Sequence, residues 1–235
     1  MNYAVILSGG VGNRFGADIP KQYLDACGKP IIRYTLERFF SASCIDKIVV
    51  VANATWHEFI GEIISALPQK PFDFADAGAS RQGSIFNGLK KCVESGIEDG
   101  DRVIIHDAVR PLVSGALINK CMDALDENDA VMPVLHVNDT VYVSDDGTHV
   151  SGLLDRDKLY AGQAPEAFKL KKYYELNNAL TADALDSIRG SSELAFKNGL
   201  AIKLIDGDLR NFKITTVADL ERFKQILEQG NYESI

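Results

Sequence analysis

A glycine-rich loop with two basic residues follows the first apolar run of the chain. Residues 3–7 are all apolar, residues 8–16 contain four glycines and Arg14, and Lys21 comes shortly afterwards. Glycines let the backbone turn tightly and bring its N–H groups up to a ligand, and the cations add positive charge at the same place. The loop therefore predicts a polyphosphate site more strongly than a plain strand-to-helix turn with two solvated basic residues.

The spacing of these glycines departs from two common phosphate-binding motifs. Phe15 occupies the position of the third glycine in a dinucleotide-binding G-x-G-x-x-G motif. Gly28 and Lys29 are followed by Pro30, where a P-loop requires serine or threonine. We therefore expect a nucleotide-binding loop of another kind.

Further polar residues follow later apolar runs. Asp107 ends such a run, and as a carboxylate it would contact a ribose or substrate hydroxyl, lie near Mg²⁺, or only cap a turn and pair with Arg110. These alternatives stay open. Basic residues occupy similar turn-like positions, namely Arg14, Lys21, Arg81, Arg110, Arg156 and Lys213. If they converge, they suit phosphoryl or nucleotidyl transfer, which depends on positioning and charge neutralisation.

Apolar runs alternate with helical periodicity through the first 135 residues. The expected strands are 3–7, 47–52, 72–75, 101–105 and 130–135, and the expected helices are 30–40, 55–67, 80–94 and 114–126, with Ser80 as the N-cap of the third helix. This alternation predicts an α/β fold with a doubly wound, mostly parallel, Rossmann-like sheet. Ligands bind beyond the carboxyl ends of such strands, where the loops 8–16, 78–81 and 106–111 are expected to lie.

The pattern changes at residues 136–160. This stretch alternates in polarity and contains an Asp146-Gly147 turn signal, so it predicts a β-hairpin. We expect one domain, 1–235, from which 136–160 protrudes as an extended β-arm for dimerisation; a solvated flap is the alternative. Beyond the arm, helices are expected at 169–180, 191–198 and from residue 216, with a strand at 201–205.

Composition narrows the class of protein. The 235 residues are 46% hydrophobic and 25% charged, which is typical of a soluble globular protein. A net charge of -8 argues against a general nucleic-acid binder. The chain has neither a long apolar run nor a basic leader, so we expect no membrane span and a cytoplasmic location. Four cysteines without C-x-x-C spacing predict neither a zinc site nor a disulfide framework.

Seven segments together resemble one family over almost the whole chain. They are 7–14, 20–23, 78–84, 106–111, 139–140, 163–165 and 211–215. In sequence and order they are similar to the methylerythritol-phosphate and ribitol-phosphate cytidylyltransferases, which have the nucleotide-diphosphosugar transferase-like fold. Six or seven matching segments in the right order are far more specific than one glycine loop.

The resemblance implies a role for each matching residue. CTP would be bound by Leu7, Ser8, Gly9, Gly10, Gly12, Asn13, Arg14, Lys21, Gly78, Ala79, Ser80, Ser84, Asp107 and Ala108. The phosphate substrate would be bound by Asp107, Arg156 and Lys213, with Arg156 supplied by the arm of a second subunit. Arg110 and Arg189 are further candidates for this substrate, and a plain surface charge is the alternative for Arg189. Arg14, Lys21, Arg156 and Lys213 would be catalytic. A homodimer is implied, with Mg²⁺ carried mainly by the CTP phosphates and no metal site of the protein's own.

Three departures from the family pattern concern the second substrate. Tyr142 stands where the methylerythritol-phosphate enzymes usually have lysine, Ala164 replaces a threonine, and Arg189 lies where a Thr-Asp pair is usual. The main hypothesis is therefore a cytidylyltransferase that makes a CDP-polyol from a ribitol 5-phosphate-like substrate for a surface polymer. The alternative is the methylerythritol-phosphate enzyme of isoprenoid synthesis. A non-catalytic nucleotide-binding module is the hypothesis from another class.

Overall fold

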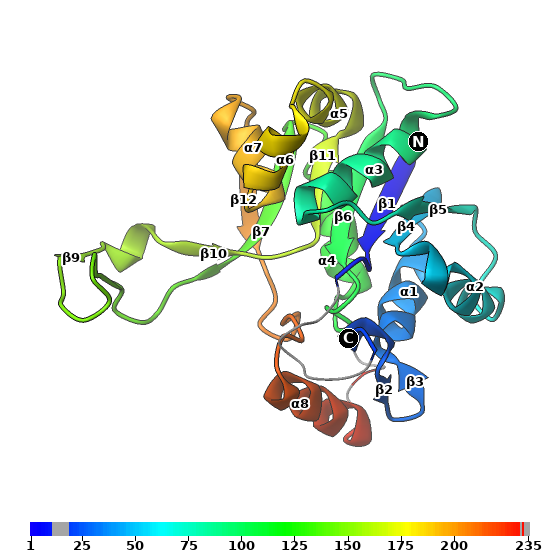
Figure 1. The fold of residues 1–235 in the computed structure, drawn as a ribbon, viewed down its shortest axis with the longest axis horizontal. Helices are drawn as coiled ribbons and strands as arrows, with labels where there is room; N and C mark the ends of the chain where they lie inside the picture. Colours follow the sequence, from blue (N-terminus) through cyan, green and yellow to red (C-terminus); the bar gives the residue numbers. More distant parts are fainter. Residues whose placement is uncertain (11–18, 231, 233–235) are drawn as a thin grey trace.

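A computed structural model describes residues 1–10, 19–230 and 232 of the chain (Figure 1). Three residues with a predicted role in phosphate binding, Gly12, Asn13 and Arg14, lie outside this range. The main sheet has eight strands: seven follow the order β10-β7-β11-β6-β1-β4-β5, and β12 pairs with β7. The mostly parallel α/β sheet predicted from the sequence is confirmed.

The centre of the sheet is formed by uniformly apolar parallel strands. β1 (Asn2–Leu7) lies between β4 (Lys47–Ala52) and β6 (Arg102–Asp107), and β5 (Phe72–Asp76) is parallel to β4. Side chains of β1 alternate between two separate cores, because Ala4 and Ile6 pack on one face while Tyr3 and Val5 pack on the other. Burial on both faces explains why these strands lack polar alternation.

The other half of the sheet is mixed. β7 (Ala130–His136) and β12 (Ile202–Asp206) are parallel, whereas β10 (Tyr160–Gly162) and β11 (Glu166–Lys169) run antiparallel to β7. β11 fills the gap between β6 and β7 and is antiparallel to both. The sequence analysis did not predict β10 or β11. Their short lengths explain this, since three or four residues give too little alternation to detect.

Helices cover both faces of the sheet (Figure 1). One face carries α1 (Ile31–Ser41), α2 (His57–Ser65) and α4 (Gly115–Asp123). The opposite face carries α3 (Arg81–Val93), α5 (Leu170–Asn178) and α7 (Ser191–Lys197), with α6 (Ala182–Ser187) beside α3. Within the described residues, no helix combines the length and apolarity that crossing a bilayer requires.

The C-terminal helix packs against a small hairpin near the start of the chain. α8 (Val217–Glu228) contacts β2 (Asp25–Ala26), which pairs with β3 (Lys29–Pro30). Thr216 and Asp219 form a capping box at the start of α8, which confirms the helix predicted from residue 216. This packing brings residues just before α8 back to the carboxyl ends of β1 and β6, as the backbone hydrogen bond from Ile214 N–H to the Val109 carbonyl shows.

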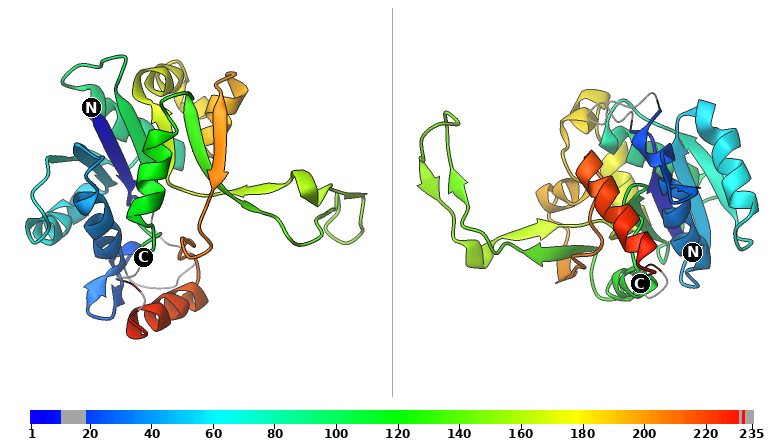
Figure 2. Two further views of the ribbon diagram at one scale, coloured as in Figure 1. Left: turned by 180° about the vertical axis from the view of Figure 1, so that it is seen from behind. Right: turned by 90° about the horizontal axis from the view of Figure 1, so that it is seen from below.

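Residues 136–160 extend away from the sheet (Figures 1 and 2). The hairpin predicted here is confirmed, since β8 (Tyr142–Val143) pairs antiparallel with β9 (Gly152–Leu153). Gly147 lies in the connecting turn with φ +74°, a conformation that favours glycine. The arm exposes apolar side chains, among them Tyr142 at 62% and Leu153 at 65%.

Candidate active site

A first cavity, called here the nucleotide cavity, lies beyond the carboxyl ends of β1 and β6. Its volume is about 550 Å³. It is lined by Leu7, Ser8, Gly9, Gly10, Lys21, Gln22, Gly78, Ala79, Ser80, Arg81, Ser84, Asp107, Val109, Lys213 and Thr215. Most of the residues with a predicted role in CTP binding are thus gathered around one space at the expected edge of the sheet.

Side chains from the 3-10 turn Lys21–Tyr23 hold the described start of the glycine loop. The Gln22 amide Nε2 donates to the carbonyl oxygens of Ser8 at 2.6 Å and of Gly10 at 2.9 Å. The hydroxyls of Ser8 and Tyr23 are 3.0 Å apart. A Cβ atom on Gly9 would come within 2.5 Å of Ala77 Cβ. The loop is therefore fixed at its base, and glycine at position 9 allows the close approach of the neighbouring segment.

The start of α3 forms the opposite wall of the nucleotide cavity. The Ser80 hydroxyl accepts a hydrogen bond from Gly83 N–H at 3.1 Å, which confirms the predicted N-cap. The Ser84 hydroxyl accepts from Gly78 N–H at 3.0 Å. A Cβ on Gly78 would lie 2.4 Å from the carbonyl carbon of Gly83, so only glycine fits there. Ala108, by contrast, is fully buried, and its N–H donates to the Leu7 carbonyl.

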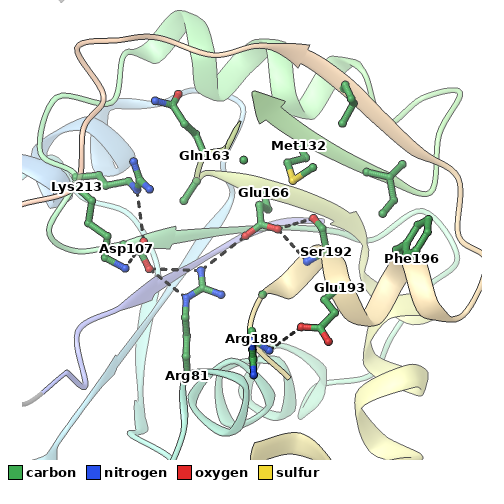
Figure 3. Close-up of a pocket in the computed structure, with 16 residues that line it drawn as sticks. Arg81, Asp107, Met132, Gln163, Glu166, Arg189, Ser192, Glu193, Phe196 and Lys213 are labelled. Carbon is green, nitrogen blue, oxygen red and sulfur yellow. Dashed lines mark hydrogen bonds and ion pairs between the residues drawn. The ribbon is translucent and has the colours of Figure 1, made fainter. Parts of the chain in front are cut away.

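The most strongly charged point of the site is Asp107, which is nearly buried at the end of β6. Its carboxylate is 3.0 Å from Lys213 Nζ, 3.4 Å from Arg81 Nη2 and 3.5 Å from Arg110 Nε (Figure 3). Burial alone would raise the pKa of Asp107, but the charges of Arg81, Lys213 and Arg110 outweigh it and hold the pKa well below its usual range. Asp107 is therefore ionised at neutral pH and organises three cations.

Arg81 connects Asp107 to a second buried carboxylate. Its Nη1 donates to the Ser191 hydroxyl at 2.7 Å, and its Nη2 lies 3.7 Å from Glu166 Oε1. The sequence analysis placed Arg81 among the basic turn residues but gave it no role in the site. Its position directly after the N-cap Ser80 was the available signal, because the first residue of α3 must lie at the edge of the sheet.

A second and larger cavity, called here the acceptor cavity, adjoins the first. Its volume is about 740 Å³, and three charged residues, Arg81, Asp107 and Lys213, line both cavities. Arg110 and Arg189, two of the predicted substrate-binding residues, line it as well. Apolar side chains also line it: Met132 and Phe196 lie on the side away from Asp107 in Figure 3, and Ile202 and Leu204 contribute as well. Two anionic substrates placed in the two cavities would therefore meet at one group of charges.

Arg156, a predicted catalytic residue, lines neither cavity of its own chain. It begins the 3-10 turn Arg156–Lys158 on the arm, is exposed, and donates from Nη1 to the Asn138 carbonyl at 3.1 Å. The resemblance assigned it to the site of a second subunit, so its distance from the site of its own chain agrees with that expectation without testing it.

The carboxylate and imidazole side chains of this site are poorly placed to hold Mg²⁺ on their own. Among the described residues, no group of three or more His, Cys, Asp or Glu side chains is arranged to hold a metal ion. Asp107 has both carboxylate oxygens next to cations, and these compete with a metal. His106 is also unsuited: it is fully buried, which lowers its pKa to about 4, and its Nε2 is 3.1 Å from the Arg110 carbonyl.

Two cavities that meet at one carboxylate and two cations, beyond the carboxyl ends of a doubly wound sheet, define the class of protein as a nucleotidyltransferase. Such a centre holds two phosphate groups together and offsets their repulsion. Comparison with known proteins then identifies the family. Residues 2–229 match the family model described as 2-C-methyl-D-erythritol 4-phosphate cytidylyltransferase, and the chain belongs to that family. It is a CTP-dependent cytidylyltransferase of this type.

Solved structures agree with this assignment. The 4-diphosphocytidyl-2C-methyl-D-erythritol synthase of Anaerococcus prevotii is 26% identical with a TM-score of 0.80, and the match covers 97% of this chain and 98% of that one. The Francisella tularensis 2-C-methyl-D-erythritol 4-phosphate cytidylyltransferase has a TM-score of 0.79 at 24% identity, covering 95% of this chain and 98% of its own. The second match supports the fold alone. The family found is the one that the sequence analysis kept as the alternative, whereas its main hypothesis of a surface-polymer enzyme finds no support here.

Proposed function

We propose that this chain transfers the CMP group of CTP to 2-C-methyl-D-erythritol 4-phosphate and releases pyrophosphate. The observation that carries the proposal is the set of three charged residues, Arg81, Asp107 and Lys213, that lines both cavities. A phosphate oxygen of the acceptor attacks the α-phosphorus of CTP in line, and the bond to the pyrophosphate oxygen breaks. The family match supports methylerythritol phosphate as the acceptor.

Each group of residues has a proposed part in this reaction. The nucleotide cavity holds CTP through the glycine loop, Lys21 and the start of α3. Lys213, with Arg110 and Arg189, binds the acceptor phosphate, and Asp107 positions Arg81 and Lys213 by ion pairing. Cations at this position stabilise the charge that grows on the transferring and leaving phosphates. Mg²⁺ accompanies the CTP phosphates and neutralises part of their charge.

Assembly is part of the same proposal. The chain acts as a single domain whose arm, residues 136–160, packs on a second subunit in a homodimer. The exposed apolar residues of the arm, such as Tyr142 and Leu153, support this, because isolated exposed apolar side chains on a thin hairpin gain stability from being covered. Arg156 then reaches the acceptor cavity of the partner.

Ribitol 5-phosphate is the second candidate acceptor, and Ala164 is the residue that favours it. Ala164 lines the acceptor cavity where the family pattern expects a threonine. The cavity therefore lacks one hydroxyl that would contact the substrate. Without this hydroxyl, the cavity cannot make one hydrogen bond to methylerythritol phosphate, which favours a substrate whose hydroxyls are arranged differently.

A pyrophosphate-release assay tests these proposals. CTP and Mg²⁺ are incubated with the protein and either methylerythritol 4-phosphate or ribitol 5-phosphate, and with ATP, GTP or UTP in place of CTP as controls. Faster release with methylerythritol 4-phosphate is the expected result. Faster release with ribitol 5-phosphate would reverse the order of the two candidates. Tight CTP binding without turnover on either acceptor would instead indicate a non-catalytic nucleotide-binding module.

A further inference from the structure

Glu166 is a buried carboxylate in the wall of the acceptor cavity. It begins β11, where it lies between the two longer strands β6 and β7, and it is 8% exposed. It lines the acceptor cavity but not the nucleotide cavity. A carboxylate this buried is costly unless its oxygens are satisfied, so its hydrogen bonds show what it can still do.

The two oxygens of Glu166 are used unequally. Oε2 accepts hydrogen bonds from both the N–H (3.0 Å) and the hydroxyl of Ser192 (Figure 3). Among the described residues, Oε1 has one ion-pair partner, Arg81 Nη2 at 3.7 Å, which is too long for a direct hydrogen bond. An ionised carboxylate can accept about four hydrogen bonds. Oε1 therefore retains the capacity to accept from a ligand.

The charge of Glu166 determines which part of a ligand it can face. A phosphate would be repelled by this carboxylate, and the cations Lys213 and Arg110 offer it a better place beside Asp107. The acceptor phosphate therefore points toward Lys213, and the polyol chain extends toward Glu166. A hydroxyl is the group that a polyol can donate there, and a charged acceptor binds it more strongly than a neutral one.

We infer that Glu166 is a specificity-determining residue that accepts a hydrogen bond from a hydroxyl of the acceptor's polyol chain. This inference rests on the proposed function and deepens it, because it assigns to one side chain the choice among polyol phosphates. Ser192 holds the carboxylate in place through Oε2, and Oε1 makes the contact with the substrate.

Glu166→Gln is the test, since it keeps the shape but loses the charge. Steady-state kinetics are measured with CTP and whichever of methylerythritol 4-phosphate and ribitol 5-phosphate the wild type uses better. We expect kcat/KM for the acceptor to fall about 10- to 100-fold, as for losing a hydrogen bond to a charged group, while the KM for CTP changes less than about twofold. Glu62→Gln is the matched control. Glu62 is exposed on α2 and lines neither cavity, so the same change there should have little effect.

Monodeoxy analogues of the same acceptor separate substrate contact from a structural role. With the wild type, kcat/KM for one analogue should be 10- to 100-fold lower than for the intact acceptor. With Glu166→Gln, this analogue and the intact acceptor should give the same kcat/KM. A wild type that accepts every analogue equally well overturns the inference, and this measurement does not depend on whether the variant folds. If kcat/KM falls equally for CTP and for the acceptor in a folded Glu166→Gln variant, the inference is also overturned, because equal losses indicate a structural role. If the wild type turns over neither acceptor, the proposed function fails first, and this inference fails with it.

Discussion

Replacing Lys213 by methionine removes one of the cations at the junction of the two cavities while keeping much of the side chain's length. Lys213 Nζ lies 3.0 Å from Asp107, and its side chain is 36% exposed. We propose that in the reaction it contacts the acceptor phosphate as that group attacks the α-phosphorus of CTP. The change should therefore slow the chemical step more than it weakens CTP binding.

The size of the effect follows from the charge geometry. Two unit charges about 3 Å apart attract by roughly 5–6 kcal/mol at an effective dielectric constant of about 20. Partial exposure screens this, which leaves about 3–4 kcal/mol, the same range as the removal of one donor from an oxyanion site. The predicted loss in kcat is therefore about 10²- to 10³-fold.

The assay is pyrophosphate release at saturating CTP with either acceptor. Lys203→Met, on the exposed edge strand β12, is the matched control and should leave kcat within about twofold of the wild type. Thermal unfolding checks that the fold survives, which we expect because Arg81 and Arg110 still neutralise Asp107. Unchanged turnover in a folded Lys213→Met would refute the proposed junction of the two substrates.

Two further predictions concern the frame of the site. Gly78→Ala should raise the KM for CTP at least tenfold, because its Cβ would lie 2.4 Å from the Gly83 carbonyl carbon. Gly61→Ala is the control: it lies in α2 with open space around it and should raise the free energy of unfolding by about 0.5–1 kcal/mol. Asp107→Asn should lower the unfolding temperature near pH 7. The cations hold the pKa of Asp107 down despite its burial, so the ionised group stabilises the fold above about pH 4 and loses this contribution as pH falls. Calorimetry should show the difference between variant and wild type shrink toward pH 3, and a constant difference would contradict the assignment.

The sequence predicted the nucleotide half of the molecule well. Uniform apolar runs identified β1, β4 and β6, and Ser80 was recognised as an N-cap because its hydroxyl acts within its own turn. The edge of the sheet where the loops gather followed from the parallel topology alone. Local signals were sufficient here because each feature depends on residues close together in the chain.

The acceptor half depends on contacts that no local pattern reveals. Glu166 and Ser192 are 26 residues apart, and Arg81 and Asp107 are also 26 apart. β11 is only four residues long, follows a proline and is antiparallel to both neighbouring strands. Hydrophobic periodicity could therefore not place Glu166 inside the sheet. The choice between the two polyol phosphates depended on three substituted positions, and the family comparison favoured the alternative that those positions had argued against.

The two cavities are lined by different segments of the chain, and this affects how the specificity of the enzyme can evolve. Most residues that line the nucleotide cavity come before position 110, and most residues that line the acceptor cavity come from 132–204. Only the small charged group at the boundary belongs to both. Mutations in the later segment can thus alter which second substrate fits the acceptor cavity while the nucleotide cavity keeps its lining, so the two specificities can change independently.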